Sequence, residues 1–184
     1  MTFFYKHKPA IFAIFLIAAL FAISIIAVIT LNPYQLKYKT DILFVAEKYN
    51  IAPEIIASVV NAESGFKKDA KSRQGALRLM QIMPSTAEWV CSLQSKPFDK
   101  NLLLEKEYNL DVGSYYLKYL LDKFTSLETA LAAYNAGEGN VMLWLLSEKY
   151  SPDQKNIITT PFKETNFYIE KVLTGVKIYK NKLK

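Results

Sequence analysis

The sequence has few of the cysteine and histidine residues on which many enzyme mechanisms depend. Cys91 is the only cysteine and His7 the only histidine among the 184 residues. A single cysteine excludes an internal disulfide bond, and the apolar neighbours of Cys91 indicate core packing. His7 precedes a long apolar run, so the rest of the chain cannot form a Ser-His or Cys-His nucleophile or a histidine-based zinc site. A carboxylate remains as the candidate catalytic group.

Two further patterns are missing. The formal net charge is +6, but no cluster of lysine and arginine outlines a groove for nucleic acid, so we do not expect nucleic acid as a partner. The charge suits either an anionic envelope surface or an ordinary solvated, lysine-rich surface. Alternating runs of β-branched residues are also absent, and apolar residues repeat at helical spacing instead. We therefore expect an all-α fold.

The longest apolar run covers residues 10–31 and contains no charged residue. As a helix it would be about 33 Å long, enough to cross the core of a bilayer. The alternative is a secretory signal, whose apolar region would be shorter and would end at a small-residue cleavage site. We expect residues 1–9 to be a short cytoplasmic N-terminus, 10–31 a single transmembrane helix, 32–40 a linker and 41–184 a folded domain.

The stretch 52–66 centres on Glu63. Val59 and Val60 belong to a helical apolar pattern, and Glu63 falls on the same face, four and three residues later. Gly65 can end this helix in a left-handed conformation. Desolvation and the negative end of the helix dipole both raise the pKa of Glu63, as a general acid near neutral pH requires. The alternative is a solvated glutamate at a fraying helix end.

Other helices follow from the same periodicity. Ser85 with Glu88, and Thr125 with Glu128, match the capping-box pattern that begins a helix. A glycine inside a helix costs about 1 kcal/mol relative to alanine, so we expect Gly113 to allow a close helix contact. A short buried helix is also expected at 141–146. Four other predicted helices have the following core residues: Ile42, Val45, Ala46 and Tyr49 in the first; Leu110, Leu117, Leu120 and Phe124 in the second; Leu127, Leu131 and Tyr134 in the third; and Ile169, Val172, Val176 and Tyr179 in the last.

Four motifs follow one another along the chain. They are the Glu63-Ser64 pair, the stretch GALRLMQIMPSTA at 75–87, AYNAG at 133–137, and Glu164-Thr165 with Tyr168. In this order and spacing they resemble the SLT domain of the lytic murein transglycosylases, a lysozyme-like family that cleaves the glycan strand of peptidoglycan. The resemblance covers about residues 42–179. It implies a lysozyme-like helical domain, which the transmembrane helix expected from the apolar run at 10–31 would precede.

The resemblance also implies the roles of individual residues. Glu63 matches the catalytic acid of the family. Gln81 could offer donors and an acceptor to an acetamido group. Plainer interpretations remain open for three residues: a helix-end hydroxyl for Ser64, a core position for Tyr134 and a solvated surface position for Glu164. The matching substrate-binding positions are Ser64, Met80, Gln81, Tyr134, Asn135, Glu164 and Tyr168.

The family reaction needs only one carboxyl group, whereas most glycosidases need two. The resemblance implies cleavage between N-acetylmuramic acid and N-acetylglucosamine, with Glu63 acting first as acid and then as base. The product is a 1,6-anhydro-muramoyl end, and no metal or cofactor is implied. The implied partners are peptidoglycan glycan strands, with cell-envelope machinery as a further candidate. Such a substrate requires the domain to be extracytoplasmic on a single-pass membrane protein.

One residue departs from the family pattern. Arg78 stands where the family has glycine, immediately before Leu79-Met80-Gln81. If its guanidinium group reached Glu63, it would lower the pKa of the carboxyl group and weaken the acid. Two alternative functions therefore stay open. One is a catalytically impaired peptidoglycan-binding protein, and the other is a hydrolase of the goose-type lysozyme kind.

Overall fold

The computed structural model describes residues 15–22, 24 and 33–184, and the chain divides into two compact units, Met1–Pro33 and Tyr34–Lys184. In the first unit, residues 15–22 and 24 are helical and exposed. Among the described residues, no helix is both long enough and apolar enough to cross a membrane. Most of the predicted anchor at 10–31, and all of the predicted N-terminus at 1–9, lie outside the described residues.

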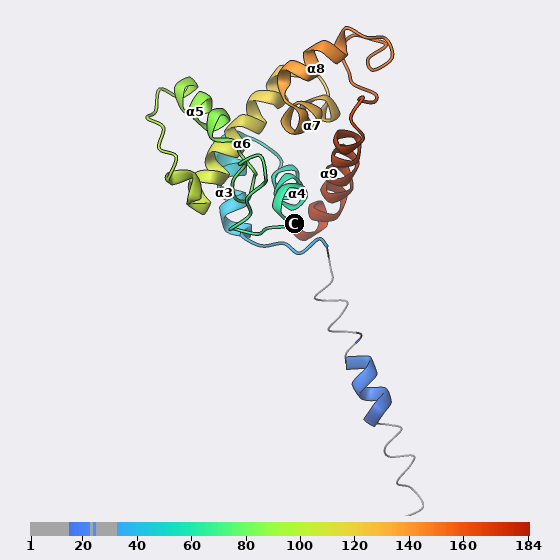
Figure 1. The fold of residues 1–184 in the computed structure, drawn as a ribbon. Helices are drawn as coiled ribbons and strands as arrows, with labels where there is room; N and C mark the ends of the chain where they lie inside the picture. Colours follow the sequence, from blue (N-terminus) through green and yellow to red (C-terminus); the bar gives the residue numbers. More distant parts are fainter. Residues whose placement is uncertain (1–14, 23, 25–32) are drawn as a thin grey trace, which may run out of the picture. The chain divides into compact units, whose positions relative to one another are not determined.

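The second unit is built from helices, so the all-α prediction is confirmed for this part of the chain. The only β pairing within residues 33–184 consists of isolated bridges that join Leu77 to Lys71 and Ile82. The elements, shown in Figure 1, are α3 (Lys39–Tyr49), α4 (Pro53–Ser64), α5 (Pro84–Leu93), the 3₁₀ helix η1 (Leu102–Leu104), α6 (Lys106–Lys123), α7 (Leu127–Ala136), α8 (Glu138–Leu145) and α9 (Lys163–Lys182).

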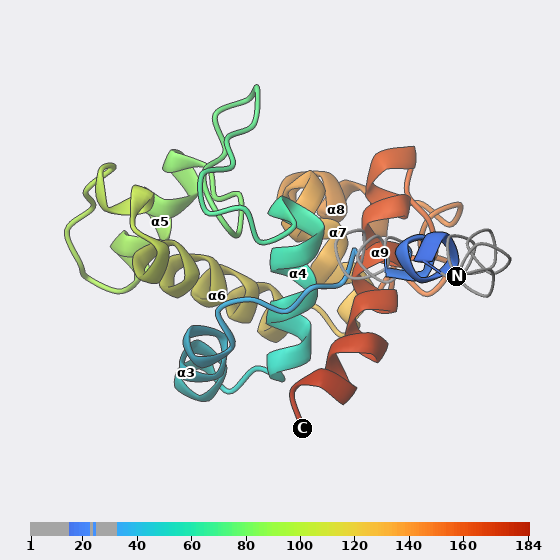
Figure 2. The ribbon, with the colours of Figure 1, turned by 90° about the horizontal axis from the view of Figure 1, so that it is seen from below.

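Helix α4 is central to this unit. It lies between α6 and α9 in Figure 2, packs along α9 and also contacts α3. Val59 and Val60 are fully buried, as the apolar pattern predicts. Gly175 of α9 faces Ser58 of α4, where a Cβ atom would approach the Ser58 Oγ atom to 2.9 Å. The close packing of α9 on the helix that carries Glu63 therefore depends on a residue without a side chain.

Helix α4 ends at Gly65, as the sequence predicts, and two other helices also end at residues of positive φ. Asn50 and Gly65 adopt left-handed conformations, with φ of 51° and 58°, directly after α3 and α4. Gly137, with φ of 89°, follows the last residue of α7. Glycine reaches positive φ without the steric cost of a Cβ atom, so these turns are encoded locally.

The predicted capping boxes are wrong. Helix α5 begins at Pro84, a favourable first-turn residue, and no side chain caps its N-terminus. Helix α7 is capped by Ser126 rather than Thr125, because the Ser126 Oγ atom accepts a hydrogen bond of 3.1 Å from the Thr129 backbone N–H group. The prediction of a buried helix at 141–146 is also wrong in part, since Leu143 is 66% exposed.

Residues 34–38 pack onto the helical unit. The Tyr179 hydroxyl donates to the Gln35 carbonyl oxygen at 3.3 Å, and the Tyr34 ring meets the Tyr179 ring edge to face at 6.2 Å. Lys182 donates to the Tyr34 carbonyl oxygen. The part of the predicted linker from residue 34 onward thus lies against α9.

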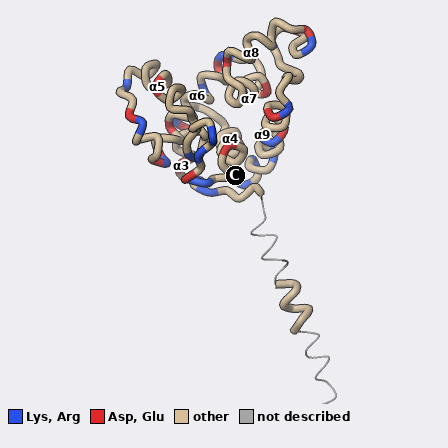
Figure 3. The backbone as a smooth tube through the Cα atoms, viewed as in Figure 1, with Lys and Arg blue, Asp and Glu red and all other residues tan. Residues whose placement is uncertain are grey.

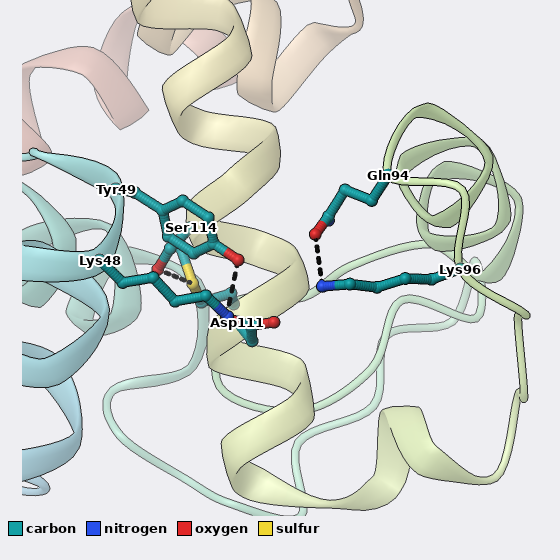
Figure 4. A network of polar contacts seen from close by, with 7 residues as sticks. Lys48, Tyr49, Gln94, Lys96, Asp111 and Ser114 are labelled. Carbon is teal, nitrogen blue, oxygen red and sulfur yellow. Dashed lines mark hydrogen bonds and ion pairs between the residues drawn. The ribbon is translucent and has the colours of Figure 1, made fainter.

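Helix α3 is joined to α6 through Asp111. The Tyr49 hydroxyl donates to Asp111 Oδ1 at 2.7 Å, and Lys48 forms an ion pair with the same oxygen (Figure 4). Burial, followed by the hydrogen bond to Asp111, raises the pKa of Tyr49. Lysine, arginine and acidic residues are scattered over the whole unit (Figure 3).

Candidate active site

Glu63 lies in the last turn of α4, next to the core residues Val59 and Val60, and keeps part of its surface accessible. Burial is the largest effect on its carboxyl group and raises the pKa to about 7. Glu164 also raises this pKa, whereas Tyr168 and Lys171 lower it. The predicted upward shift is therefore confirmed, and desolvation is its main cause.

Two tyrosines lie beside the carboxyl group. Burial, followed by the negative charge of Glu63, raises the pKa of both Tyr134 and Tyr168 well above the usual value. Both phenols therefore stay neutral near neutral pH. Within the described residues the buried Tyr168 hydroxyl has no partner at normal hydrogen-bond length, yet it lies near enough to favour the Glu63 anion.

The end of α7 connects the neighbouring segments. The Tyr134 hydroxyl donates to the Met80 carbonyl oxygen at 3.0 Å. Asn135 Oδ1 accepts a hydrogen bond of 2.9 Å from the Thr165 hydroxyl at the start of α9. The AYNAG motif thus joins the loop after α4 to α9, and both of its polar side chains have protein partners.

Ser64 and Met80 face the interior. Ser64 is buried, and its hydroxyl donates to the Leu79 carbonyl oxygen at 2.9 Å. Met80 is fully buried. These two predicted substrate-binding residues therefore lie beneath the site, where they fix the end of α4 to the loop that follows.

Gln81 and Arg78 both adopt left-handed conformations, with φ of 48° and 66°. The Gln81 Nε2 atom donates to the carbonyl oxygens of Arg78 and Ala70, at 2.8 and 3.2 Å. Its donors are therefore used inside the loop, and the amide oxygen is the atom left for a ligand. A positive φ at residue 78 also accounts for the family glycine there, because glycine adopts it without strain.

The Arg78 side chain is held by partners in its own loop. Its guanidinium group donates to the Lys68 carbonyl oxygen at 2.6 Å and pairs with Asp69 at 2.7 Å. The expectation that Arg78 could weaken the acid is thus not supported by its position. The positive φ of Arg78 introduces some backbone strain, and its side chain joins two parts of its own loop.

Sequence reasoning missed Asn109, which lies on α6 and is completely buried. Its Oδ1 atom accepts from the Met80 backbone N–H group, and its Nδ2 atom donates to the Leu77 carbonyl oxygen, both at 2.9 Å. One turn later, a Cβ atom at Gly113 would come within 2.6 Å of Met80 Sδ. The predicted close contact at Gly113 is therefore made with a loop side chain and not with another helix. An asparagine on an otherwise apolar helix face was the available signal.

Sequence reasoning also missed Lys171. Its Nζ atom donates to the Ala62 carbonyl oxygen at 2.9 Å, and its charge lowers the pKa of Glu63. Lys171 follows Tyr168 by three residues and Glu164 by seven, so the three share one face of α9. That spacing would have identified it.

The site therefore joins four segments around one carboxyl group of near-neutral pKa. Glu164 supplies a second carboxylate nearby, on the exposed start of α9. Within residues 15–22, 24 and 33–184, no three histidine, cysteine or acidic residues come close enough to hold a metal ion. The arrangement can donate a proton to a bound group and take one back.

Comparison with known proteins identifies relatives of this architecture. The family model of the transglycosylase SLT domain matches residues 42–158. The soluble lytic murein transglycosylase of Salmonella typhimurium is 35% identical over 136 residues, which cover 72% of this chain and 21% of the relative. The same enzyme of Escherichia coli K12 is 34% identical over 142 residues, covering 73% and 22%. The chain thus spans about a fifth of the length of these relatives.

Solved structures of lytic transglycosylases are also similar to this chain. An inactive mutant of the lytic transglycosylase Slt from Pseudomonas aeruginosa superposes with a TM-score of 0.72 at 30% identity, covering 82% of this chain and 25% of that one. The 70 kDa soluble lytic transglycosylase from Escherichia coli gives 0.72 at 30% identity, covering 80% and 25%, and a complex of the 70 kDa enzyme with bulgecin A gives 0.71 at 29%. The predicted lysozyme-like helical domain is therefore confirmed, and the chain belongs to the SLT family of lytic transglycosylases.

Proposed function

We propose that this chain is a lytic transglycosylase that cleaves the bond between N-acetylmuramic acid and N-acetylglucosamine in peptidoglycan. The observation that carries the proposal is Glu63, a partly accessible carboxyl group whose pKa is raised to about 7. A group with this pKa is protonated in part of the molecules at neutral pH and can also lose its proton easily. It suits both halves of the reaction.

In the first half, Glu63 protonates the glycosidic oxygen, the bond from C1 of the muramoyl residue to this oxygen breaks, and N-acetylglucosamine leaves with a free hydroxyl group. The acetamido group of the muramoyl residue stabilises the cation that develops at C1. In the second half, the Glu63 carboxylate takes the proton from the C6 hydroxyl, whose oxygen closes onto C1 to give the 1,6-anhydro ring. Lys171 and the Tyr168 phenol favour the carboxylate that exists between the two steps. Burial favours the protonated form that begins and ends the cycle.

Glu164 supports a second candidate function. Most glycosidases use two carboxyl groups, and Glu164 lies close enough to raise the pKa of Glu63. If Glu164 activated a water molecule, the chain would be a hydrolase of the goose-type lysozyme kind. The third candidate, a binding protein without activity, is weakened because Arg78 pairs with Asp69 instead of approaching Glu63.

We further propose that residues 10–31 anchor the domain to the cell membrane with the domain on the extracytoplasmic side. Support for this comes from the length of the run and its lack of charge. Lys6 and Lys8 balance Lys37 and Lys39, so orientation rests on the location of the substrate. Peptidoglycan strands are the proposed partner, with cell-envelope machinery as a further candidate.

The test is digestion of purified peptidoglycan by the full chain, followed by mass analysis of the products. We expect anhydro-muramoyl ends. Reducing ends would favour the hydrolase, and binding without cleavage would favour the binding protein. Because a related enzyme forms a complex with bulgecin A, we also expect this compound to bind the chain.

A further inference from the structure

A lysine-rich surface lies at the C-terminal end of α9. Residues 33–40 and 172–184 contain no acidic residue. They contain six lysines, which we call the basic surface: Lys37, Lys39, Lys177, Lys180, Lys182 and Lys184. All of them except Lys182 are exposed. In the part of the chain that the structure describes, none of the six takes part in an ion pair, so their charges are available to an anionic ligand.

The two segments of the basic surface are fixed to each other. Lys39 donates to the Lys182 carbonyl oxygen at 3.3 Å, and Lys182 donates to the Tyr34 carbonyl oxygen. Tyr179 adds its ring contact with Tyr34 and its hydrogen bond to Gln35. In Figure 1 residue 34 and the C-terminal end of α9 lie at the same edge of the unit. The lysines are therefore held on one face of the folded unit.

The basic surface is also close in the chain to the apolar run at 10–31. Only Asn32 and Pro33 separate Leu31 from Tyr34, and this length of chain extends over at most about 11 Å. Tyr34 already packs on α9, so no long flexible spacer remains. If residues 10–31 span the membrane, as proposed above, the basic surface therefore has to stay beside the lipid headgroups.

We propose that the basic surface binds the headgroups of acidic phospholipids and so docks the folded unit on the membrane that holds its anchor. The proposal rests on the proposed function through its membrane anchor, and it does not depend on the reaction of Glu63. A bilayer that contains acidic lipids has a negative surface potential, and each lysine near it raises the docking equilibrium constant about 5-fold. The headgroup phosphates supply hydrogen-bond acceptors for the ammonium groups.

Helix α9 connects the basic surface to the candidate active site. Each residue of an α-helix adds about 1.5 Å, so Tyr168 and Lys180 are about 18 Å apart along the axis of α9. Tyr168 lies beside Glu63. A docked unit therefore holds Glu63 at a fixed height and orientation above the lipid surface. Docking restricts cleavage to glycan strands that lie close to the membrane.

The test uses the full chain in nanodiscs, made either of phosphatidylcholine alone or of phosphatidylcholine with phosphatidylglycerol. A donor dye is attached at the exposed position 174 of α9 through Thr174→Cys, with the buried Cys91 changed to serine, and lipid headgroups carry the acceptor dye. Single-molecule energy transfer then gives the ratio of docked to undocked units. We expect a higher ratio with phosphatidylglycerol, and a lower one when added salt screens the lysines.

Two pairs of lysine substitutions provide a matched comparison. Lys177→Gln with Lys180→Gln removes two charges from the basic surface, so the ratio with phosphatidylglycerol should fall about 30-fold. Lys149→Gln with Lys155→Gln removes the same charge from the exposed segment between α8 and α9, at the opposite edge of the unit in Figure 1. This second pair should leave the ratio unchanged. Circular dichroism checks that each variant folds.

The same ratio in both kinds of nanodisc, or an equal loss in both pairs of variants, would overturn the basic surface as a lipid-binding site. Release of the parent chain from membranes by alkaline carbonate would show that it has no anchor, and the docking proposal would fail with the anchor. In detergent, the variant at Lys177 and Lys180 should cleave purified peptidoglycan at the rate of the parent chain. A parent chain that docks but does not cleave would contradict the proposed reaction and leave the docking proposal intact.

Discussion

Lys171 donates a hydrogen bond of 2.9 Å from its ammonium group to the carbonyl oxygen of Ala62, the residue that precedes Glu63. The last carbonyl groups of a helix have no partner within the helix, so α9 supplies one for α4. The same contact fixes a positive charge beside the catalytic carboxyl group. Lys171 therefore has two roles: it stabilises the end of α4, and it affects proton transfer by Glu63.

Substitutions of Lys171 distinguish its effect on the helix end from its effect on proton transfer. Lys171→Met removes a charge that lowers the pKa of Glu63, so the pKa should rise. Because Glu63 must be protonated to act as the acid, the alkaline limb of the kcat/KM profile should move to higher pH, by about one unit. Lys171→Arg keeps the charge and should leave the limb in place. A lower melting temperature in Lys171→Met with an unmoved limb would show that the residue only caps α4.

Arg78→Gly tests the departure from the family motif. Glycine relieves the positive φ of 66° but loses the pair with Asp69. We expect stability to change by less than about 1 kcal/mol, since exposed ion pairs contribute little, and we expect the pH profile to stay the same. Asp69→Ala removes the pair without relieving the backbone and should be the less stable of the two. A shift of the alkaline limb in Arg78→Gly would show that the guanidinium group does act on Glu63.

Asn109→Ala tests how far the loop after α4 depends on α6. The substitution removes two buried hydrogen bonds and leaves the Met80 N–H group without its partner. The expected loss is about 2–3 kcal/mol in the free energy of unfolding by urea. Turnover should fall as well, because Tyr134 is bound to the Met80 carbonyl oxygen. The exposed Asn140 of α8 is the matched control, and its change to alanine should cost less than about 0.5 kcal/mol. A similar cost at both positions would contradict the role assigned to Asn109.

Glu63 should also destabilise the folded protein at high pH. Its pKa is about 7 in the folded state against an ordinary value of 4.5, so between these values unfolding releases a proton and stability falls as pH rises. The Glu63→Gln variant cannot ionise and avoids this loss. It should be more stable than the parent by about 2–3 kcal/mol at pH 8, with no such gain at pH 4. Glu164→Gln keeps the Glu63 carboxyl group and should therefore retain most of the parent's loss of stability at high pH. Equal gains for Glu63→Gln at both pH values would show that the carboxyl group is not desolvated.

The features that could be predicted from the sequence are those that depend on residues close together in the chain. Helical periodicity located the buried face of α4, and Gly65 marked the end of this helix. The near-neutral pKa of Glu63 also followed from its place on that face. These features require only neighbours three or four residues apart, which a single sequence displays.

The remaining features depend on contacts between distant segments. Asn109 is separated from Leu77 by 32 residues and Lys171 from Ala62 by 109, so their roles emerge only when the helices are packed. The predicted capping boxes are wrong for a different, local reason. Helix α5 begins with a proline in its first turn, and the Ser126 hydroxyl caps the start of α7.

The direct test of the central claim, that Glu63 is the one proton-transfer group, is the rate of peptidoglycan cleavage by Glu63→Gln. Glutamine keeps the size of the side chain but cannot cycle a proton, so the rate should fall at least 10²- to 10⁴-fold, the usual contribution of general acid–base catalysis. Sedimentation with insoluble peptidoglycan should show that glycan binding is retained. Glu164→Gln should cost less, because that carboxylate acts only through its charge. Cleavage by Glu63→Gln at the rate of the parent chain would contradict the claim.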